Sequence, residues 1–283
     1  MKKNIEQRAD LAALTKKEKI ALDFLIKNQG TACLMTSNEI GRELGIGASS
    51  VVRLSAKLGF ENFTAMRKAL HNQVLGSGQP APEQIPYEKL ADTEHLSEPE
   101  LLEAYTRNVE NHIRVDSNRE TEAKLQSVAG AILKAQRVFV VGFRACAGFA
   151  GAFVTMLTCC RANVFSVGRD QPLVDQLMGL TSKDLLIAFS FHRYSKDTFF
   201  AAQMARDMNA SVAVMTDSFT APLAEYADIV VINSVDNFSF FNAYTSLVMN
   251  MEKIVLLVGH KSIKDTRKRL ADMERYLDKT NQY

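Results

Sequence analysis

Apolar residues recur at helical spacing near the N-terminus of the chain. Residues 15–18 have the pattern of a capping box, and residues 20–26, which follow, have the spacing of an amphipathic helix. Ser37 can cap a second, short helix whose inward face would be formed by Ile40 and Leu44. These patterns predict two helices that share one apolar core.

A tight turn follows the second helix at Gly45-Ile46-Gly47, and Gly47 is an acceptable N-cap for a third helix. The apolar contacts of this third helix are expected from Val51, Val52, Leu54 and Leu58, and its outer face from Ser49, Ser50, Arg53 and Lys57. Two short helices joined by a glycine-bounded turn, with a basic second helix, are the layout of a helix-turn-helix DNA reader. An ordinary small helical bundle is the alternative that the same pattern allows.

The predicted DNA contacts lie on this motif. Ser50 can donate a hydrogen bond to a phosphate or a base, and Arg53 can make a bidentate contact with guanine or a phosphate. Lys57 is expected to contact the phosphate backbone, because its ammonium group is a point charge. The residues expected at the DNA are Ser37, Ser49, Ser50, Arg53 and Lys57.

A further helix is predicted to pack back on the core through Phe60, Phe63, Met66 and Leu70. Residues 14–70 resemble the N-terminal domain of the RpiR/HexR-type (MurR/RpiR) bacterial transcription regulators, most specifically at residues 50–54 and 57–60. One departure is Gly47, where the family usually has a capping serine. The resemblance implies an all-α helix-turn-helix domain that binds DNA.

From residue 137 onward, short apolar runs alternate with helical segments. Strands are predicted at residues 138–141, 164–167, 185–190, 211–216 and 229–232. Helices are predicted at residues 99–117, 120–135, 145–160, 196–208, 222–226 and from 237 to about 258. Strands that alternate with helices indicate an α/β domain with a parallel sheet flanked by helices.

Ligands in open α/β sheets bind beyond the carboxyl ends of the strands. The loops at residues 142–148, 166–170, 190–198 and 216–218 are therefore where a ligand is expected. The order and spacing over residues 125–260 resemble a sugar isomerase (SIS) domain, most closely at residues 140–142, 184–190, 214–217 and 222–228. The resemblance implies the phosphosugar-binding module that follows the helix-turn-helix in the RpiR/HexR-type family.

Two arginines stand where the chain departs from the SIS pattern. Typical members have a glycine-serine turn after the first strand, whereas Arg144 lies near the second glycine here and Cys146 at the serine. The second loop usually reads Ser-x-Ser-Gly, whereas residues 190–193 read Ser-Phe-His-Arg. We expect Arg144 and Arg193 to clamp a phosphate or carboxylate by bidentate hydrogen bonds. The expected effector-binding residues are Gly142, Arg144, Cys146, Ser190, His192, Arg193, Ser195 and Thr198.

Other roles for these residues stay open. Either arginine can instead pair with a structural acid, Asp170 or Asp197. The imidazole of His192 is a candidate general acid or base, but that role also needs a partner that the sequence does not identify. A thiol at Cys146 can be a nucleophile or simply a small residue that fits the turn. We expect no catalytic residue.

Charge and proline content divide the chain. Residues 1–75 carry 12 Lys and Arg against 7 Asp and Glu, a net charge of +5, which suits a polyanionic partner. Residues 76–125 carry 5 against 11, and four of the six prolines lie between residues 80 and 99, as in a linker. We predict a helix-turn-helix domain at 1–75, a linker and connecting helix at 76–124, and an SIS-type effector-binding domain at 125–283.

The sequence also bears on location and cofactors. No apolar segment follows Met1, so we expect no secretory signal and a cytoplasmic protein. The longest uncharged run, residues 145–160, is too short to span a membrane, so no membrane partner is expected. The four cysteines lack CxxC spacing. We therefore expect reduced thiols, no metal and no cofactor.

These features predict a transcription regulator whose SIS domain senses a small anionic sugar metabolite, either a phosphosugar or a sugar acid, and modulates operator binding. Its partners would be double-stranded operator DNA, the effector, and further copies of the chain in a homodimer or homotetramer, because paired half-sites need paired readers. The apolar helix over residues 244–257 is expected to contribute to that contact. The alternative is a sugar-phosphate isomerase with an accessory helical domain, for which the basic N-terminal segment has no use.

Overall fold

The computed structural model describes residues 13–280 apart from 29–31, 34, 75–89, 91–92, 95 and 220. The chain divides into two compact units, the first up to Leu96 with Phe238–Phe241, the second from Ser97 to Asn237 and from Asn242 onward. The glycine- and proline-rich start of the predicted linker lies outside the described residues. The domain limits at residues 75 and 124 stay predictions.

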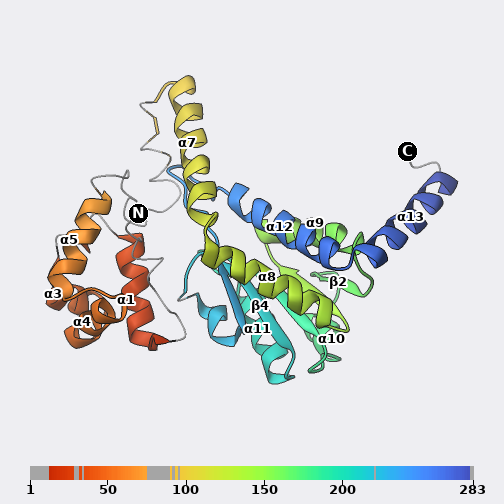
Figure 1. The fold of residues 1–283 in the computed structure, drawn as a ribbon, viewed down its shortest axis with the longest axis horizontal. Helices are drawn as coiled ribbons and strands as arrows, with labels where there is room; N and C mark the ends of the chain where they lie inside the picture. The colour runs from red at the N-terminus through yellow and green to blue at the C-terminus, as the bar shows by residue number, and fades with distance from the viewer. Residues whose placement is uncertain are drawn as a thin grey trace. The chain divides into compact units, whose positions relative to one another are not determined.

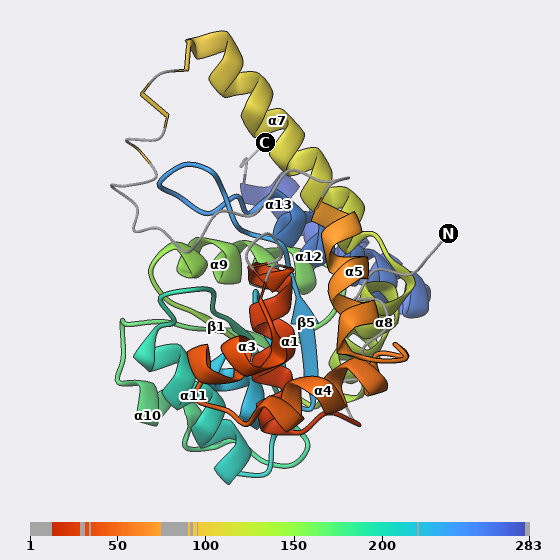
Figure 2. The ribbon, with the colours of Figure 1, turned by 90° about the vertical axis from the view of Figure 1, so that its left-hand side faces the viewer.

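The described part of the first unit up to Val74 is helical. Its helices are α1 (Lys16–Lys27), α3 (Ser37–Glu43), α4 (Ala48–Lys57) and α5 (Phe63–Val74), coloured red to orange in Figure 2. They enclose a core that includes Leu22, Leu25, Ile40, Val51, Leu54, Leu58, Met66 and Leu70, all buried. The predicted helical domain is confirmed, because the apolar positions at helical spacing meet in one core.

Capping boxes begin the first two helices. Thr15 caps α1, with Glu18 completing the box as predicted. The cap of α3 is Thr36, so the prediction that Ser37 caps this helix is wrong. Thr36 Oγ1 accepts a hydrogen bond from the Glu39 backbone N at 3.2 Å, and Glu39 Oε2 accepts one from the Thr36 N at 2.7 Å. The glutamate three residues later therefore selects Thr36 over its neighbour.

The turn between α3 and α4 needs its glycines. Gly45 has a φ of 62°, in the left-handed region that glycine adopts without strain. Gly47 is the N-cap of α4, as predicted, but offers no side-chain hydrogen bond. A Cβ atom on Gly41 would lie 2.9 Å from the Ile46 carbonyl oxygen, so this glycine lets α3 approach the turn closely.

The second unit contains a five-stranded parallel sheet. Its strands are β1 (Val138–Gly142), β2 (Val164–Val167), β3 (Leu185–Phe189), β4 (Ser211–Thr216) and β5 (Ile229–Ile232), in the order β2-β1-β3-β4-β5. Its helices are α7 (Glu98–Asp116), α8 (Arg119–Lys134), α9 (Ala145–Thr158), α10 (Leu173–Leu177), α11 (Lys196–Asp207), η3 (Pro222–Tyr226), α12 (Thr245–Lys261) and α13 (Ile263–Thr280). The predicted α/β domain with a parallel sheet is confirmed.

Helices cover both faces of the sheet (Figure 1). On one face, α8, α9 and α12 pack against alternate strand residues such as Val140 and Ile187. On the other, α10, α11 and η3 pack against the intervening residues such as Val141 and Ala188. The central strands are therefore buried on both sides, which is why they read as continuous apolar runs.

The helices of the second unit differ in part from the prediction. The last predicted helix begins at Thr245 instead of residue 237, because the preceding segment folds back on itself, with the Ala243 N–H donating to the Val235 carbonyl. The helices α10 and α13 were not predicted. The segment at Pro222–Tyr226 is a 3₁₀ helix. Within the described residues, no helix has both the length and the apolar character needed to cross a membrane.

Candidate functional site

The outward face of α4 is the candidate nucleic-acid surface of the first unit. Ser49 and Arg53 are exposed, as predicted. Val52, predicted to be a core contact, is 44% exposed, whereas Val51, Leu54 and Leu58 are buried. The face therefore combines a hydroxyl, a valine side chain and a guanidinium group.

Ser50 lies on the other side of this helix. Ser50 is only 3% exposed, so the prediction that it faces outward is wrong. Its Oγ accepts a hydrogen bond of 3.2 Å from Arg53 Nη2. The buried hydroxyl therefore helps to position the exposed guanidinium. Ser37, the other serine of the set, is half-buried in the first turn of α3.

Lys57 is engaged within the protein. Its ammonium donates to Glu18 Oε2 at 2.7 Å and to the Ala13 carbonyl oxygen at 2.7 Å. Glu18 is buried, and Arg53 Nε lies 3.6 Å from its second carboxylate oxygen. The geometry gives Lys57 a role in joining α4 to α1. Its expected phosphate contact stays a prediction.

The candidate ligand site of the second unit lies where the strand order reverses. The strands β1 and β3 are hydrogen-bonded neighbours with Gly142 opposite Phe189, whereas β2 lies on the far side of β1. The loops that follow β1 and β3 therefore leave the sheet side by side at a topological switch point. The predicted effector residues lie at the end of β1, on these two loops and in the first turns of α9 and α11.

Arg144 and Arg193 share an unusual backbone conformation. Both have a positive φ, 58° and 65° respectively, which costs a residue with a side chain on the order of 1–3 kcal/mol. Both are exposed, and neither forms an ion pair with another described residue. Asp197, one of the acids expected as an alternative partner, instead contacts Arg169 Nη2 at 2.5 Å.

Cys146 is enclosed at the start of α9. Burial raises the pKa of its thiol to about 11, and the nearby charge of Asp217 also raises it. A hydrogen bond from the Phe191 backbone lowers this pKa, but by less. The thiol is therefore neutral near pH 7, which argues against a reactive thiolate. A Cβ atom on Gly142 would lie 2.6 Å from the Cys146 carbonyl oxygen, so glycine is required where β1 meets α9.

Asp217 organises the loop after β3. Its carboxylate accepts hydrogen bonds from the His192 backbone N at 3.2 Å and from the Tyr194 hydroxyl at 3.0 Å. The Thr216 hydroxyl donates to it at 3.3 Å. Asp217 thus connects the end of β4 to the loop that carries Arg193. The side chain of His192 is exposed.

Hydroxyl groups surround the start of α11. Ser195 is the N-cap of this helix, and its Oγ accepts from the Thr198 backbone N at 3.5 Å. Thr198 is fully buried, yet its Oγ1 has no hydrogen-bond partner among the described residues. Ser190, at the end of β3, is also buried. An unpartnered buried hydroxyl costs free energy unless a ligand or water satisfies it.

Sequence reasoning missed Asp217, Tyr194 and Tyr244 as members of this site. The ring of Tyr244 packs against Phe149 and Phe191, with centroid distances of 4.7 and 5.6 Å. Burial raises the pKa of its hydroxyl, and the neighbouring Cys146 raises it further. The loop containing Asp217 was among those expected to hold a ligand. No pattern in the sequence indicated that Tyr244 would lie close to Cys146 and Phe191.

The two units together define the class of protein. A glycine-turn pair of helices with an exposed arginine is joined in one chain to a parallel α/β domain with polar loops at its switch point. This is the architecture of a helix-turn-helix regulator with an additional α/β domain.

Comparison with known families agrees. The helix-turn-helix domain of the rpiR family matches residues 1–75, and the SIS domain matches residues 131–257. An uncharacterized HTH-type transcriptional regulator from Haemophilus influenzae is 24% identical over 78% of this chain and 76% of its own length. The Escherichia coli regulator YfhH is 26% identical over 72% of this chain and 71% of its own length.

Solved structures have the same fold. The sugar isomerase domain of an RpiR transcription factor from Sphaerobacter thermophilus is 21% identical, with a TM-score of 0.57 over 62% of this chain and 98% of that one. The Vibrio vulnificus NanR protein, solved in complex with ManNAc-6P, is 15% identical, with a TM-score of 0.56 over 96% of this chain and 97% of that one. The chain therefore carries the helix-turn-helix domain of the rpiR family followed by an SIS domain, which is the domain composition of an RpiR-type transcription regulator.

Proposed function

We propose that this regulator binds operator DNA through α4 and a small anionic sugar metabolite at the carboxyl ends of β1 and β3, and that the metabolite modulates operator binding. One observation is the main support for effector binding. Two arginines without acidic partners among the described residues leave adjacent strands at the switch point of the sheet. An anion is the ligand that this arrangement favours.

The backbone at these arginines supports a role in binding. In the SIS pattern that the sequence resembles, the loop after the third strand carries glycine at the position of Arg193, and Arg144 lies near a second glycine. Both arginines keep the left-handed conformation that suits glycine. The loops therefore retain their shape and gain two cationic groups. Strain of this kind is retained mainly where the side chain has a function.

Hydrogen-bond donors at the start of α11 complete the proposed site. The N-terminus of a helix carries a partial positive charge and free N–H groups, which favour phosphate. The buried Thr198 hydroxyl lacks a partner there. A phosphate or carboxylate bound at this turn would accept a hydrogen bond from the Thr198 hydroxyl and would contact the two guanidinium groups.

A phosphosugar is the first class to test. The structure of NanR in complex with ManNAc-6P supports this choice, because that protein has the same fold over nearly its whole length. Arg193 at a glycine position of the usual pattern, and Arg144 near another, add charge relative to that pattern. Sugar acids therefore belong in the same panel.

The test is a thermal-shift screen of the full chain with ManNAc-6P, other hexose phosphates, their unphosphorylated parents and sugar acids. A ligand at a hundred times its dissociation constant stabilises the native state by about 2.7 kcal/mol, or roughly 5–10 °C in melting temperature for a domain of this size. We expect such a shift from an anionic sugar and none from its neutral parent.

Glycine variants identify the site. Arg144→Gly and Arg193→Gly each remove a charge without disturbing the left-handed backbone, and should abolish the shift. Asn209→Gly is the matched control, because Asn209 also has a positive φ, 61°, but lies at the far end of α11. A shift that survives both arginine substitutions contradicts the clamp.

The proposed DNA surface is Ser49, Val52 and Arg53. Arg53 can contact guanine or phosphate, and the valine side chain suits a thymine methyl group. Ser50 acts through Arg53, because its own hydroxyl is buried. Paired half-sites would be read by two copies of the domain.

A further inference from the structure

The C-terminal helix α13 exposes an apolar stripe. None of its 18 residues is buried, and Ile263, Leu270 and Tyr276 are 54%, 41% and 57% exposed. Residues at alternating spacings of three and four form a single seam along it, namely Ile263, Thr266, Leu270, Met273, Leu277 and Thr280. This is the a and d pattern by which one helix packs against another. The seam is therefore suited to a partner helix.

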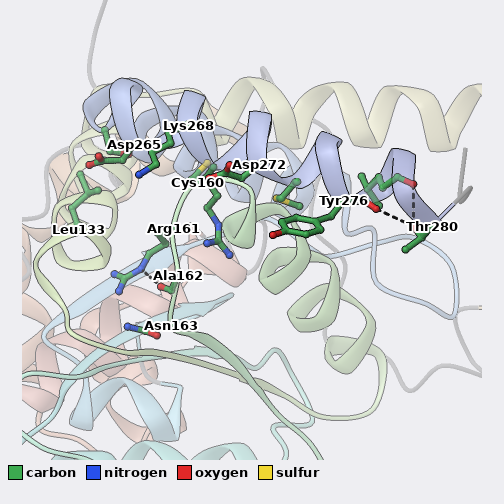
Figure 3. A pocket seen from close by; sticks show the side chains of 14 residues that line it. Leu133, Cys160, Arg161, Ala162, Asn163, Asp265, Lys268, Asp272, Tyr276 and Thr280 are labelled. Atoms are coloured by element: carbon green, nitrogen blue, oxygen red, sulfur yellow. Dashed lines mark hydrogen bonds between the residues drawn. The ribbon is translucent and has the colours of Figure 1, made fainter.

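A cavity of about 790 Å³ lies beside this seam. Figure 3 shows α13 with Tyr276 and Asp272 on one side, and Cys160, Arg161 and Ala162 from the segment between α9 and β2 on the other. Met273 and Leu277 of the seam line the same cavity. It lies at the amino-terminal edge of the sheet, opposite the proposed effector site. Apolar side chains of a second helix would have room there.

We propose that α13 pairs with α13 of a second copy of this chain in an antiparallel, two-fold symmetric contact. The charges favour this orientation. Residues 263–269 carry four basic and one acidic side chain, a net of +3, whereas residues 270–280 carry two basic and three acidic ones, a net of −1. Antiparallel pairing places the basic half of each helix against the acidic half of the other, and parallel pairing places the two basic halves together.

The flanking positions agree with this orientation. When Leu270 packs against Met273 of the second copy, Arg267 lies opposite Glu274 of the second copy, and the symmetry repeats the pair. A parallel pair would instead use Arg269. That guanidinium already donates from Nε to the Thr158 carbonyl oxygen at the end of α9. The antiparallel arrangement leaves this internal contact intact.

Sedimentation velocity of the full chain over a range of concentrations tests the contact. Leu270→Glu should halve the mass of the sedimenting species, or raise the dissociation constant of the assembly at least tenfold. Ala271→Glu is the matched control: it places the same charge one residue away, off the seam, and should leave association unchanged. Circular dichroism and the melting temperature establish that both variants fold. A wild-type chain that stays monomeric at micromolar concentration, or a Leu270→Glu variant that associates normally, overturns the proposal.

Charge reversal tests the orientation and the occupant. Arg267→Glu and Glu274→Arg should each weaken association about threefold to tenfold, because each creates two repulsive pairs. The double variant restores both attractions and should associate as the wild type does. A double variant that is no better than the single ones overturns the antiparallel pairing and leaves the seam to a different partner. The effector screen is independent of these outcomes, because α13 is remote from the loops after β1 and β3.

Discussion

At the scale of single residues, a buried carboxylate holds α4, the proposed DNA-reading helix, in place. Glu18 accepts hydrogen bonds from the Thr15 backbone N at 2.8 Å and from Lys57 at 2.7 Å. Burial alone would raise the pKa of this carboxyl, but the hydrogen bonds from Lys57 and Thr15 outweigh it and lower the pKa from 4.5 to about 2. Glu18 therefore stays charged and ties α4 to the start of α1.

Glu18→Gln should weaken this connection. We expect the free energy of local opening of α1 and α4 to fall by about 1–3 kcal/mol at pH 7, the range for a lost hydrogen bond to a charged group. Because folding lowers the pKa, the stabilisation is present above pH 4.5 and is lost as the pH falls toward 2. The defect should therefore shrink over that interval. Amide hydrogen exchange of the full chain measures this free energy of opening, and Glu43→Gln, at an exposed position of α3, is the control. A loss of stability that does not depend on pH would contradict the role given to the Glu18 carboxylate.

Arg53 and Lys57 should differ in what they do. Arg53→Ala should lower operator affinity by about 1–3 kcal/mol, the cost of one bidentate base contact, with a smaller loss of melting temperature than Lys57→Ala causes. Arg53→Lys keeps the charge and should retain non-specific binding but lose sequence discrimination. Lys57→Ala should mainly lower stability. Fluorescence anisotropy on DNA selected by the wild-type chain measures affinity, and melting curves measure stability. If Arg53→Ala binds this DNA as tightly as the wild type does, α4 is not the DNA-reading helix.

At the scale of elements, α7 is fastened to the segment that precedes α12. Asn108, His112 and Asp116 recur every four residues on one face of α7. Asn108 donates to the Asp236 carbonyl oxygen at 3.1 Å, and His112 Nε2 lies 3.2 Å from the Asp236 carboxylate. The buried Asp116 carboxylate accepts from the Ser234 N and hydroxyl, both at 2.8 Å, and from Ser246. The same segment carries Tyr244 toward the proposed effector site.

Asp116→Ala should loosen this connection. It leaves the buried donors of Ser234 and Ser246 unsatisfied, which costs about 1–3 kcal/mol. We expect faster hydrogen exchange at the end of α7 and over residues 233–237, whereas the strands β1 and β3 keep their protection. Glu110→Ala, an exposed acid on the same helix, is the control. Unchanged exchange in the Asp116 variant would mean that these hydrogen bonds do not hold α7.

At the scale of the whole molecule, assembly and DNA binding should be linked. Two helix-turn-helix domains held in one particle bind two half-sites with an effective concentration that separate domains lack. If α13 contributes to assembly, Leu270→Glu should weaken binding to a fragment with two half-sites but leave the affinity for a single half-site unchanged. Anisotropy titrations at fixed salt measure both, because phosphate contacts make the affinity strongly salt-dependent. Equal loss on both fragments would indicate a damaged reader.

The sequence by itself determined the five strands and most of the helices, but not α10, α13 or the start of α12. The helix-turn-helix, the five parallel strands and the loops that carry the candidate ligand residues all follow from local patterns. Periodicity, caps and turns depend on residues within a few positions of one another, and such contacts can be read from the chain. The two arginines that depart from the SIS pattern, Arg193 at a glycine position and Arg144 near another, were visible in the same way.

Only the tertiary structure decided which side chains are free to meet a ligand. Ser50 and Val52 are two residues apart in one helix, yet Ser50 is buried and Val52 is exposed, because α4 packs against α1 and α3 in the folded unit. The engagement of Lys57 by Glu18, the place of Asp217 under the loop of Arg193, and the approach of Tyr244 to Cys146 all join distant segments. The physical reason is that the free energy of a polar or charged group depends on its partners in space, and the fold supplies those partners from anywhere in the chain.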